Sequence, residues 1–197
     1  MKNSLLLIIC LTAFATVNAQ KNTFTLTSNS IGGQMTLKQE FNGFGCKGFN
    51  QSPQLSWKNA PEDTKSFAIT MYDPDAPTGS GWWHWLVFDL PTDTKELAAG
   101  AGIINSKKLP KGAIQSPTNY GVPGFGGPCP PEGDAPHQYI ITVYALSIDK
   151  LGLDETVNPA IVGYYLNKNT IAKASIIAYY ERKAKTEATM MMQNEKN

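Results

Sequence analysis

Charged residues are scarce in this chain: Asp, Glu, Lys and Arg make up 17% of its 197 residues, and the formal net charge is +1. A near-neutral chain without a basic stripe is not expected to bind nucleic acid. Long runs of like charge are also missing, and 42% of the residues are hydrophobic, so the composition argues against disorder. The low charge, together with 17 Gly and 13 Pro, favours one domain of short strands over a helical bundle.

Long apolar segments are absent after the N-terminus, so no integral membrane segment is predicted. The N-terminus itself has the layout of a signal peptide. Lys2 is followed by an apolar run over residues 5–15 and by small residues at 17–19. We expect cleavage after Ala19, which removes residues 1–19. The mature protein is therefore predicted to be exported, either to the periplasm or out of the cell.

Cysteine is rare as well, with three in the chain. Cys10 lies within the signal peptide, so the mature protein keeps Cys46 and Cys129. An even pair in an oxidising compartment predicts a disulfide, and both residues lie in glycine-rich loops rather than in predicted core strands. The alternative is two unrelated buried thiols. Neither cysteine is flanked by the His or Cys partners that a zinc site needs.

Patterns typical of β-strands occur five times in the chain. They alternate polar with apolar side chains, or are rich in β-branched and aromatic residues. The predicted strands span residues 23–27, 54–57, 67–72, 85–90 and 139–146. Residues 98–136 are rich in Gly, Pro, Ser and Asn, and an ordered loop of this length is usually functional.

After Asp149 the composition changes toward helix. Asp154-Glu155 followed by Asn158-Pro159 predicts a helix start, and apolar side chains then recur at helical spacing. Residues 171–180 could continue the helix or form a last strand, and residues 183–197 are predicted to be a flexible polar tail. These patterns predict a single, mainly β domain over residues 20–182 with one or two short C-terminal helices.

The chain has two histidines, and each follows a proline-rich segment. His84 comes after the Asp-Pro-Asp-Ala-Pro segment at 73–77 and stands among three tryptophans. His137 comes directly after the Gly- and Pro-rich segment 126–136 and two residues before Tyr139. Strand alternation places His137 and Tyr139 on one face, and Asp73 at a strand end could orient an imidazole.

Imidazoles, a phenol hydroxyl and loop amides would together form a donor-rich pocket suited to a phosphate or a carboxylate. Each feature alone also fits an ordinary turn or a packed core side chain. The order of strand end, rigid loop and histidine occurs twice, and this repetition favours a functional site.

The two segments resemble the signature segments of the phosphatidylethanolamine-binding protein family, in its bacterial Raf-kinase-inhibitor-like branch. The resemblance rests on residues 73–77 with His84-Trp85, and on residues 127–139, and it covers about residues 23–182. It implies an antiparallel β-sandwich with a small anion pocket at one end. The positions that it assigns to ligand binding are Asp73, Trp82, His84, Gly127, His137 and Tyr139.

Two features depart from eukaryotic members of that family. The chain ends soon after residue 182, where those members carry a further helix over the pocket. Gln138 stands where an arginine is common, which removes one positive charge near the predicted site.

The leading hypothesis is a non-enzymatic binding protein for a small anion or phosphorylated head group, with no cofactor. One alternative is a hydrolase that uses Asp73 with His84 or His137 as general base, although a Gly-x-Ser-x-Gly motif is absent. Another is a metal site built from the two histidines and Asp73 or Asp75. A further alternative is an inhibitor or interaction protein of the kinase-inhibitor-like type, with the loop over residues 98–125 as its binding surface.

Overall fold

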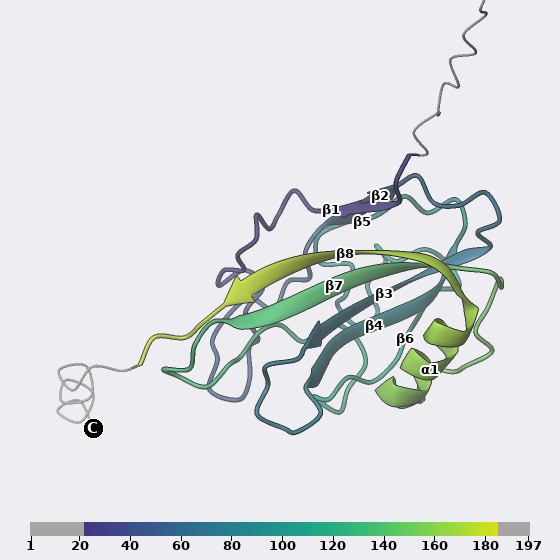
Figure 1. The fold of residues 1–197 in the computed structure, drawn as a ribbon. Helices are drawn as coiled ribbons and strands as arrows, with labels where there is room; N and C mark the ends of the chain where they lie inside the picture. The colour runs from purple at the N-terminus through teal and green to yellow at the C-terminus, as the bar shows by residue number, and fades with distance from the viewer. Residues whose placement is uncertain (1–21, 185–197) are drawn as a thin grey trace, which may run out of the picture.

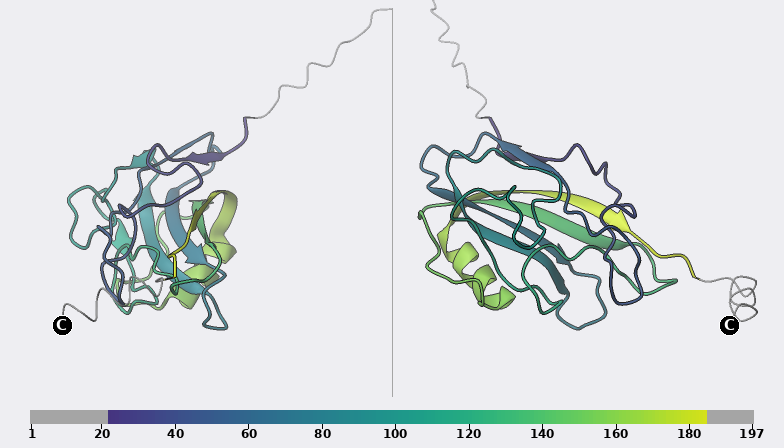
Figure 2. Two further views of the ribbon diagram at one scale, coloured as in Figure 1. Left: turned by 90° about the vertical axis from the view of Figure 1, so that its left-hand side faces the viewer. Right: turned by 180° about the vertical axis from the view of Figure 1, so that it is seen from behind.

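Two antiparallel sheets face each other, and a helix packs on the outer side of the larger sheet (Figure 1). The computed structural model describes residues 22–184. The predicted signal peptide and residues 185–197 of the predicted tail lie outside these described residues. The views in Figure 2 show the same arrangement from the side and from behind.

The small sheet has the strand order β1-β2-β5, and the large sheet has the order β6-β4-β3-β7-β8. The bounds of the small-sheet strands are Thr25–Thr27 (β1), Leu55–Lys58 (β2) and Glu96–Leu97 (β5). Those of the large-sheet strands are Ser66–Asp73 (β3), Trp82–Pro91 (β4), Ile114–Gln115 (β6), His137–Leu146 (β7) and Thr170–Tyr180 (β8). The helix, α1, spans Pro159–Asn169. The mainly β antiparallel sandwich that the sequence predicts is therefore confirmed.

Alternation along the central strands creates two apolar cores. On β3, Phe67 and Ile69 point toward the small sheet, whereas Ala68 points toward α1 and packs with Val162 and Leu166. Strands β3 and β4 are buried on both faces, which is why their sequences are almost continuously apolar. Each fully buried aliphatic or aromatic side chain contributes about 1.5–3 kcal/mol relative to an exposed one.

Helix α1 begins at the downstream end of its predicted start signal. The side chain of Asn158 accepts a hydrogen bond from the amide of Ala160 (2.8 Å), and Pro159 has no amide to satisfy. Asp154 instead forms its own turn by accepting from the amide of Thr156 (2.8 Å). Within the described residues, no helix combines the length and the apolar character needed to cross a bilayer.

Residues 171–180, which the sequence left open between helix and strand, belong to β8. This strand pairs with β7 from His137 to Leu146, and its side chains alternate in exposure. The described part of the chain therefore has one C-terminal helix rather than two.

The ends of three neighbouring strands, β4, β3 and β7, lie together at one end of the large sheet. Strand β3 runs antiparallel to both neighbours, so its last residue, Asp73, lies beside Trp82 at the start of β4. On its other side Tyr72 pairs with Ile140, which brings the start of β7, at His137, to the same end of the sheet.

His84 is the extra residue of a bulge in β4. Met71 pairs with Trp85 and Tyr72 pairs with Trp83, so no residue of β3 is paired with His84. Because of the bulge, Trp85 lies in the core between the sheets while Trp83 packs on the helix side. His84 thereby turns toward the ring of Tyr139, with 5.1 Å between the ring centroids.

Candidate functional site

A cavity of about 170 Å³ lies at this end of the large sheet. Five of the six residues that the family resemblance assigned to ligand binding line it. They come from the end of β3 (Asp73), the start of β4 (Trp82 and His84) and the start of β7 (His137 and Tyr139). The other lining residues come from loops: Phe44, Ala76, Pro77, Thr78, Tyr120, Cys129, Pro130 and Pro131.

Asp73 is buried and its two carboxylate oxygens have different roles. Oδ1 accepts hydrogen bonds from the amides of Asp75 (2.8 Å) and Ala76 (3.0 Å), which closes the proline-rich turn. Oδ2 lies 2.8 Å from Nδ1 of His137. The turn thus fixes the carboxylate in an orientation that holds one imidazole.

His137 lies between two carboxylates. Its Nδ1 contacts Asp73, and its Nε2 lies 3.5 Å from Oδ2 of Asp134. A carboxylate can only accept, so Nδ1 of His137 carries the proton in the contact with Asp73. This contact confirms the expectation that Asp73 orients an imidazole.

His84 is oriented by backbone carbonyls instead. Its Nδ1 lies 2.7 Å from the carbonyl oxygen of Gly126 and 3.2 Å from that of Gly127, so Nδ1 carries the proton. Burial lowers the pKa of His84 to about 4, although the two carbonyls and Asp73 act in the opposite direction. The ring is therefore neutral at pH 7, and its Nε2 is an acceptor. In the protein without ligand, His84 therefore presents an acceptor to the cavity rather than a donor.

Three buried polar atoms of cavity-lining residues have no hydrogen-bond partner in the protein. They are Nε2 of His84, the hydroxyl of Tyr139 and Nε1 of Trp82. Burial first, and then the charge of Asp73, raise the pKa of Tyr139, so its hydroxyl is protonated and able to donate.

Loop aromatics complete the wall, and sequence reasoning missed them. The ring of Tyr120 lies 5.4 Å from Trp82 and 5.6 Å from His84, between ring centroids. Phe44 contacts Tyr120 at 5.4 Å and is 72% exposed at the rim. Phe44 stands in a glycine-rich loop far from the signature segments. Tyr120 lies in the loop over residues 98–136, whose length suggested a function, but nothing in the sequence singles out this residue within it.

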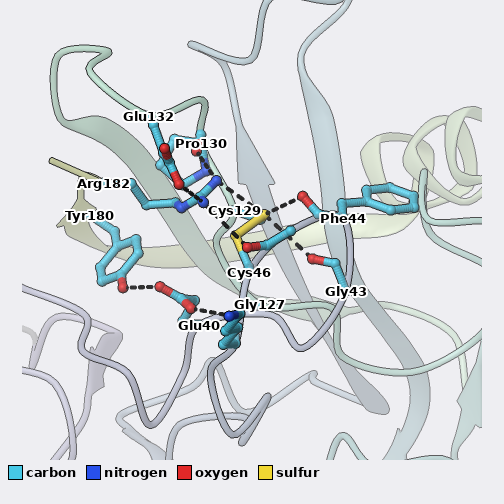
Figure 3. Close-up of a disulfide and its surroundings, with 12 residues drawn as sticks. Glu40, Gly43, Phe44, Cys46, Gly127, Cys129, Pro130, Glu132, Tyr180 and Arg182 are labelled. Carbon is cyan, nitrogen blue, oxygen red and sulfur yellow. Dashed lines mark hydrogen bonds and ion pairs between the residues drawn. A yellow bond between two sulfur atoms is a disulfide. The ribbon is translucent and has the colours of Figure 1, made fainter. Parts of the chain in front are cut away.

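The disulfide between Cys46 and Cys129 joins two loops at the rim, with 5.9 Å between the Cα atoms (Figure 3). Arg182 reaches the same loops from just beyond β8. Its guanidinium donates to the carbonyl oxygens of Pro130 and Gly45, each at 3.3 Å, and it also contacts Glu132. The predicted disulfide is thus present and lies beside the cavity, since Cys129 is one of the lining residues.

Gly127 is the one assigned residue that does not line the cavity. Its amide donates to Oδ1 of Asn50 (2.7 Å), and its carbonyl accepts from the hydroxyl of Tyr120 (2.9 Å). A Cβ at this position would lie 1.7 Å from the carbonyl oxygen of Gln39, so only glycine fits. Gly127 shapes the site from behind by allowing two loops to approach closely.

No lysine or arginine is among the lining residues. Within residues 22–184, no group of three or more His, Cys, Asp and Glu side chains is placed to hold a metal ion. Asp75, which was a candidate ligand, accepts from the amide of Gln138 (2.8 Å). The metal hypothesis therefore gains no support from the geometry.

The fold is a small antiparallel β-sandwich with a cavity at one end of its larger sheet, and comparison with known proteins identifies its family. The family model described as phosphatidylethanolamine-binding protein matches residues 27–181. The chain therefore belongs to the phosphatidylethanolamine-binding protein family.

Two Escherichia coli proteins are close relatives. The chain is 50% identical to YbcL over 90% of its own length and 98% of that protein, and 45% identical to YbhB over 79% and 98%. The crystal structure of YbcL covers 81% of this chain and 99% of its own, with a TM-score of 0.80 and 52% identity. That of CT736, a phosphatidylethanolamine-binding protein homologue from Chlamydia trachomatis, covers 82% and 99%, with a TM-score of 0.68 and 31% identity. None of these names states an enzymatic activity.

Proposed function

We propose that this is an exported, non-enzymatic binding protein whose cavity holds the phosphoryl group of a small ligand, such as a phosphoethanolamine head group. The observation that carries the proposal is the set of three unpartnered polar atoms on His84, Tyr139 and Trp82. A buried polar atom without a partner costs about 1–3 kcal/mol, so three around one cavity indicate a polar ligand. The signal-peptide pattern of residues 1–19 and the disulfide, which is rare in reducing compartments, support export.

The donors favour an oxyanion over an ammonium group. Aromatic rings beside Asp73 resemble a site for a ligand cation. However, Nε1 of Trp82 can only donate, and an ammonium group would leave it unsatisfied. An oxyanion accepts from both Trp82 and Tyr139.

Calorimetric titration with phosphoethanolamine, inorganic phosphate and ethanolamine tests the proposal. We expect the two phosphoryl ligands to bind and ethanolamine alone to bind much more weakly. Equal affinity for ethanolamine and phosphoethanolamine would show that the cavity takes the ammonium end.

Two variants connect this binding to the cavity. His137→Ala leaves the buried carboxylate of Asp73 at the cavity without its imidazole partner, so its negative charge would oppose an anionic ligand, and we expect a loss of about 1.5–3 kcal/mol, tenfold or more in affinity. Tyr139→Phe should cost about 1 kcal/mol, whereas its matched control Tyr164→Phe, on an exposed side chain of α1, should bind like wild type. Wild-type affinity in a folded His137→Ala variant would place the ligand elsewhere.

A general-base hydrolase is the second candidate, because the contact between Asp73 and His137 is the kind that orients a catalytic imidazole. Cys129 is in the disulfide and the hydroxyl of Thr78 donates to the carbonyl of Gly81 (2.6 Å), so His137 would have to activate a water molecule as the nucleophile. Turnover of phosphoesters and carboxylic esters by wild type, lost in His137→Ala, would favour this function over simple binding.

A further inference from the structure

The polar atoms around the cavity include acceptors as well as donors. Trp82 and Tyr139 offer an N–H and an O–H, while His84 offers the lone pair of Nε2. Oδ2 of Asp73, 4.0 Å from that nitrogen and 2.8 Å from Nδ1 of His137, is a further acceptor. A fully deprotonated oxyanion accepts from Trp82 and Tyr139, but its negative oxygens then face the lone pairs of His84 and Asp73 and are repelled by them.

His84 cannot become a donor to the cavity by changing tautomer, that is, by moving its proton from Nδ1 to Nε2. Its Nδ1–H is held by the carbonyl of Gly126 at 2.7 Å, and a carbonyl can only accept. The alternative is to add a second proton, at Nε2. Burial opposes that step more strongly than Asp73 and the carbonyls favour it, and a cationic His137 opposes it further.

The other titratable groups that face His84 do not favour protonation of its Nε2. Tyr139 on β7 and Tyr120 in its loop both contact the imidazole ring, and both have a pKa raised above the ordinary value, mainly by burial. They are neutral across the accessible pH range. Asp134 lies on the far side of His137, and Arg182 is engaged with Glu132 at the rim.

We infer that the cavity binds the phosphoryl group as its monoprotonated monoanion, with the P–O–H group donating to Nε2 of His84, and therefore rejects sulfates and sulfonates. This inference rests on the proposed function and names the chemical class of ligand. The ligand's unprotonated oxygens accept from Trp82 and Tyr139, and its hydroxyl satisfies the acceptor side of the cavity. His84 is then the residue that determines specificity.

Sulfate esters are the matched ligands for a test. A monoprotonated phosphate monoester and a sulfate monoester are both tetrahedral and both carry one negative charge, but only the phosphate has a proton to donate. Calorimetry at pH 6 should compare phosphoethanolamine with 2-aminoethyl sulfate, and methylphosphonate with methanesulfonate. We expect a preference for the phosphorus ligand on the order of 10- to 100-fold, because a buried acceptor left without a donor costs that much affinity.

The pH dependence should follow the ligand rather than the protein. Phosphate monoesters lose their last proton with a pKa of about 6, so affinity should fall as the pH rises above that value. For a phosphonate made more acidic by fluorine, the fall should move to lower pH by the difference between the two ligands' second pKa values. If the fall stays at one pH for both ligands, a protein group is titrating and the inference is wrong.

Two variants separate the acceptor from the donors. His84→Ala should reduce the preference for phosphate over sulfate at least several-fold. Trp82→Phe removes a donor that both ligands use, so it should weaken both and leave their ratio unchanged. Because a folded His84→Ala variant is not assured, the wild-type comparisons above stand without it.

The outcomes are distinguishable from a failure of the proposed function. Equal binding of phosphorus and sulfur ligands contradicts the selectivity and leaves the oxyanion site intact. Binding of neither class at any pH contradicts the proposed function itself.

Discussion

Removing the disulfide between Cys46 and Cys129 should lower the stability of the protein substantially. The bond closes a loop over a sequence separation of 83 residues. In the chain-entropy description, a loop of this length restricts the unfolded chain enough to contribute about 4.5 kcal/mol to the free energy of unfolding. The double variant Cys46→Ala/Cys129→Ala is the cleaner perturbation, since single variants keep a free thiol.

The folded state of that variant should keep its loops in place. The amide of Phe41 donates to the carbonyl of Pro128 at 3.0 Å, and Arg182 still reaches both loops through Gly45 and Pro130. The loss therefore arises mainly in the unfolded state. At about 2–4 °C per kcal/mol for a chain of this size, the melting temperature should fall by about 9–18 °C.

Urea unfolding at equilibrium, followed by tryptophan fluorescence, measures this loss. The oxidised wild type should unfold at a clearly higher midpoint than the double variant, and wild type treated with a reductant should match the variant. If the oxidised wild type and the variant have the same midpoint, the loop-closure argument is refuted.

Three further predictions concern other positions. Gly127→Ala should lower the free energy of unfolding by about 2–3 kcal/mol in urea, because its Cβ would collide with the carbonyl of Gln39. The control Gly32→Ala has open space around its Cβ and should change stability by less than about 0.5 kcal/mol, so equal effects would contradict the packing argument. The pKa of His84 is about 4 in the folded protein and about 6.5 in the unfolded chain, so the unfolded chain binds more protons between these pH values. The free energy of unfolding should therefore fall by up to about 3 kcal/mol as the pH drops from about 6.5 to 4. The pH profile of His84→Gln should be flatter, and a profile identical to that of wild type would contradict the assignment. Asn158→Ala removes the cap of α1 and should cost about 1 kcal/mol by the same assay, while no loss would mean that the cap hydrogen bond at 2.8 Å is dispensable.

Local patterns were sufficient to predict five of the eight described strands and part of the site, while the two-residue strands β5 and β6 were missed and β8 was left open. The continuous apolar runs around 67–72 and 85–90 predicted strands because β3 and β4 are buried on both faces. Alternation correctly placed His137 and Tyr139 on one face of β7, and both line the cavity. The two-residue period is a local property of any extended chain, so it needs no knowledge of the rest of the fold.

Contacts between distant segments could not be predicted in the same way. The bulge that turns His84 toward the cavity depends on the register between β3 and β4, which no short window of sequence contains. Phe44 and Tyr120 reach the cavity on loops whose paths are set by long-range contacts, among them the disulfide. The acceptor character of His84 depends on the carbonyl of Gly126, 42 residues away in the chain.

Nitrogen NMR of the two histidine rings tests the central claim most directly, because the whole chain contains only His84 and His137. With ¹⁵N-labelled histidine, the free protein at pH 6 should show His84 as a neutral ring protonated at Nδ1. Adding phosphoethanolamine to saturation should shift the nitrogen signals of both rings and leave His84 neutral, with its Nε2 now accepting a hydrogen bond. If a saturating ligand leaves both rings unchanged, the ligand does not occupy this cavity and the account is contradicted.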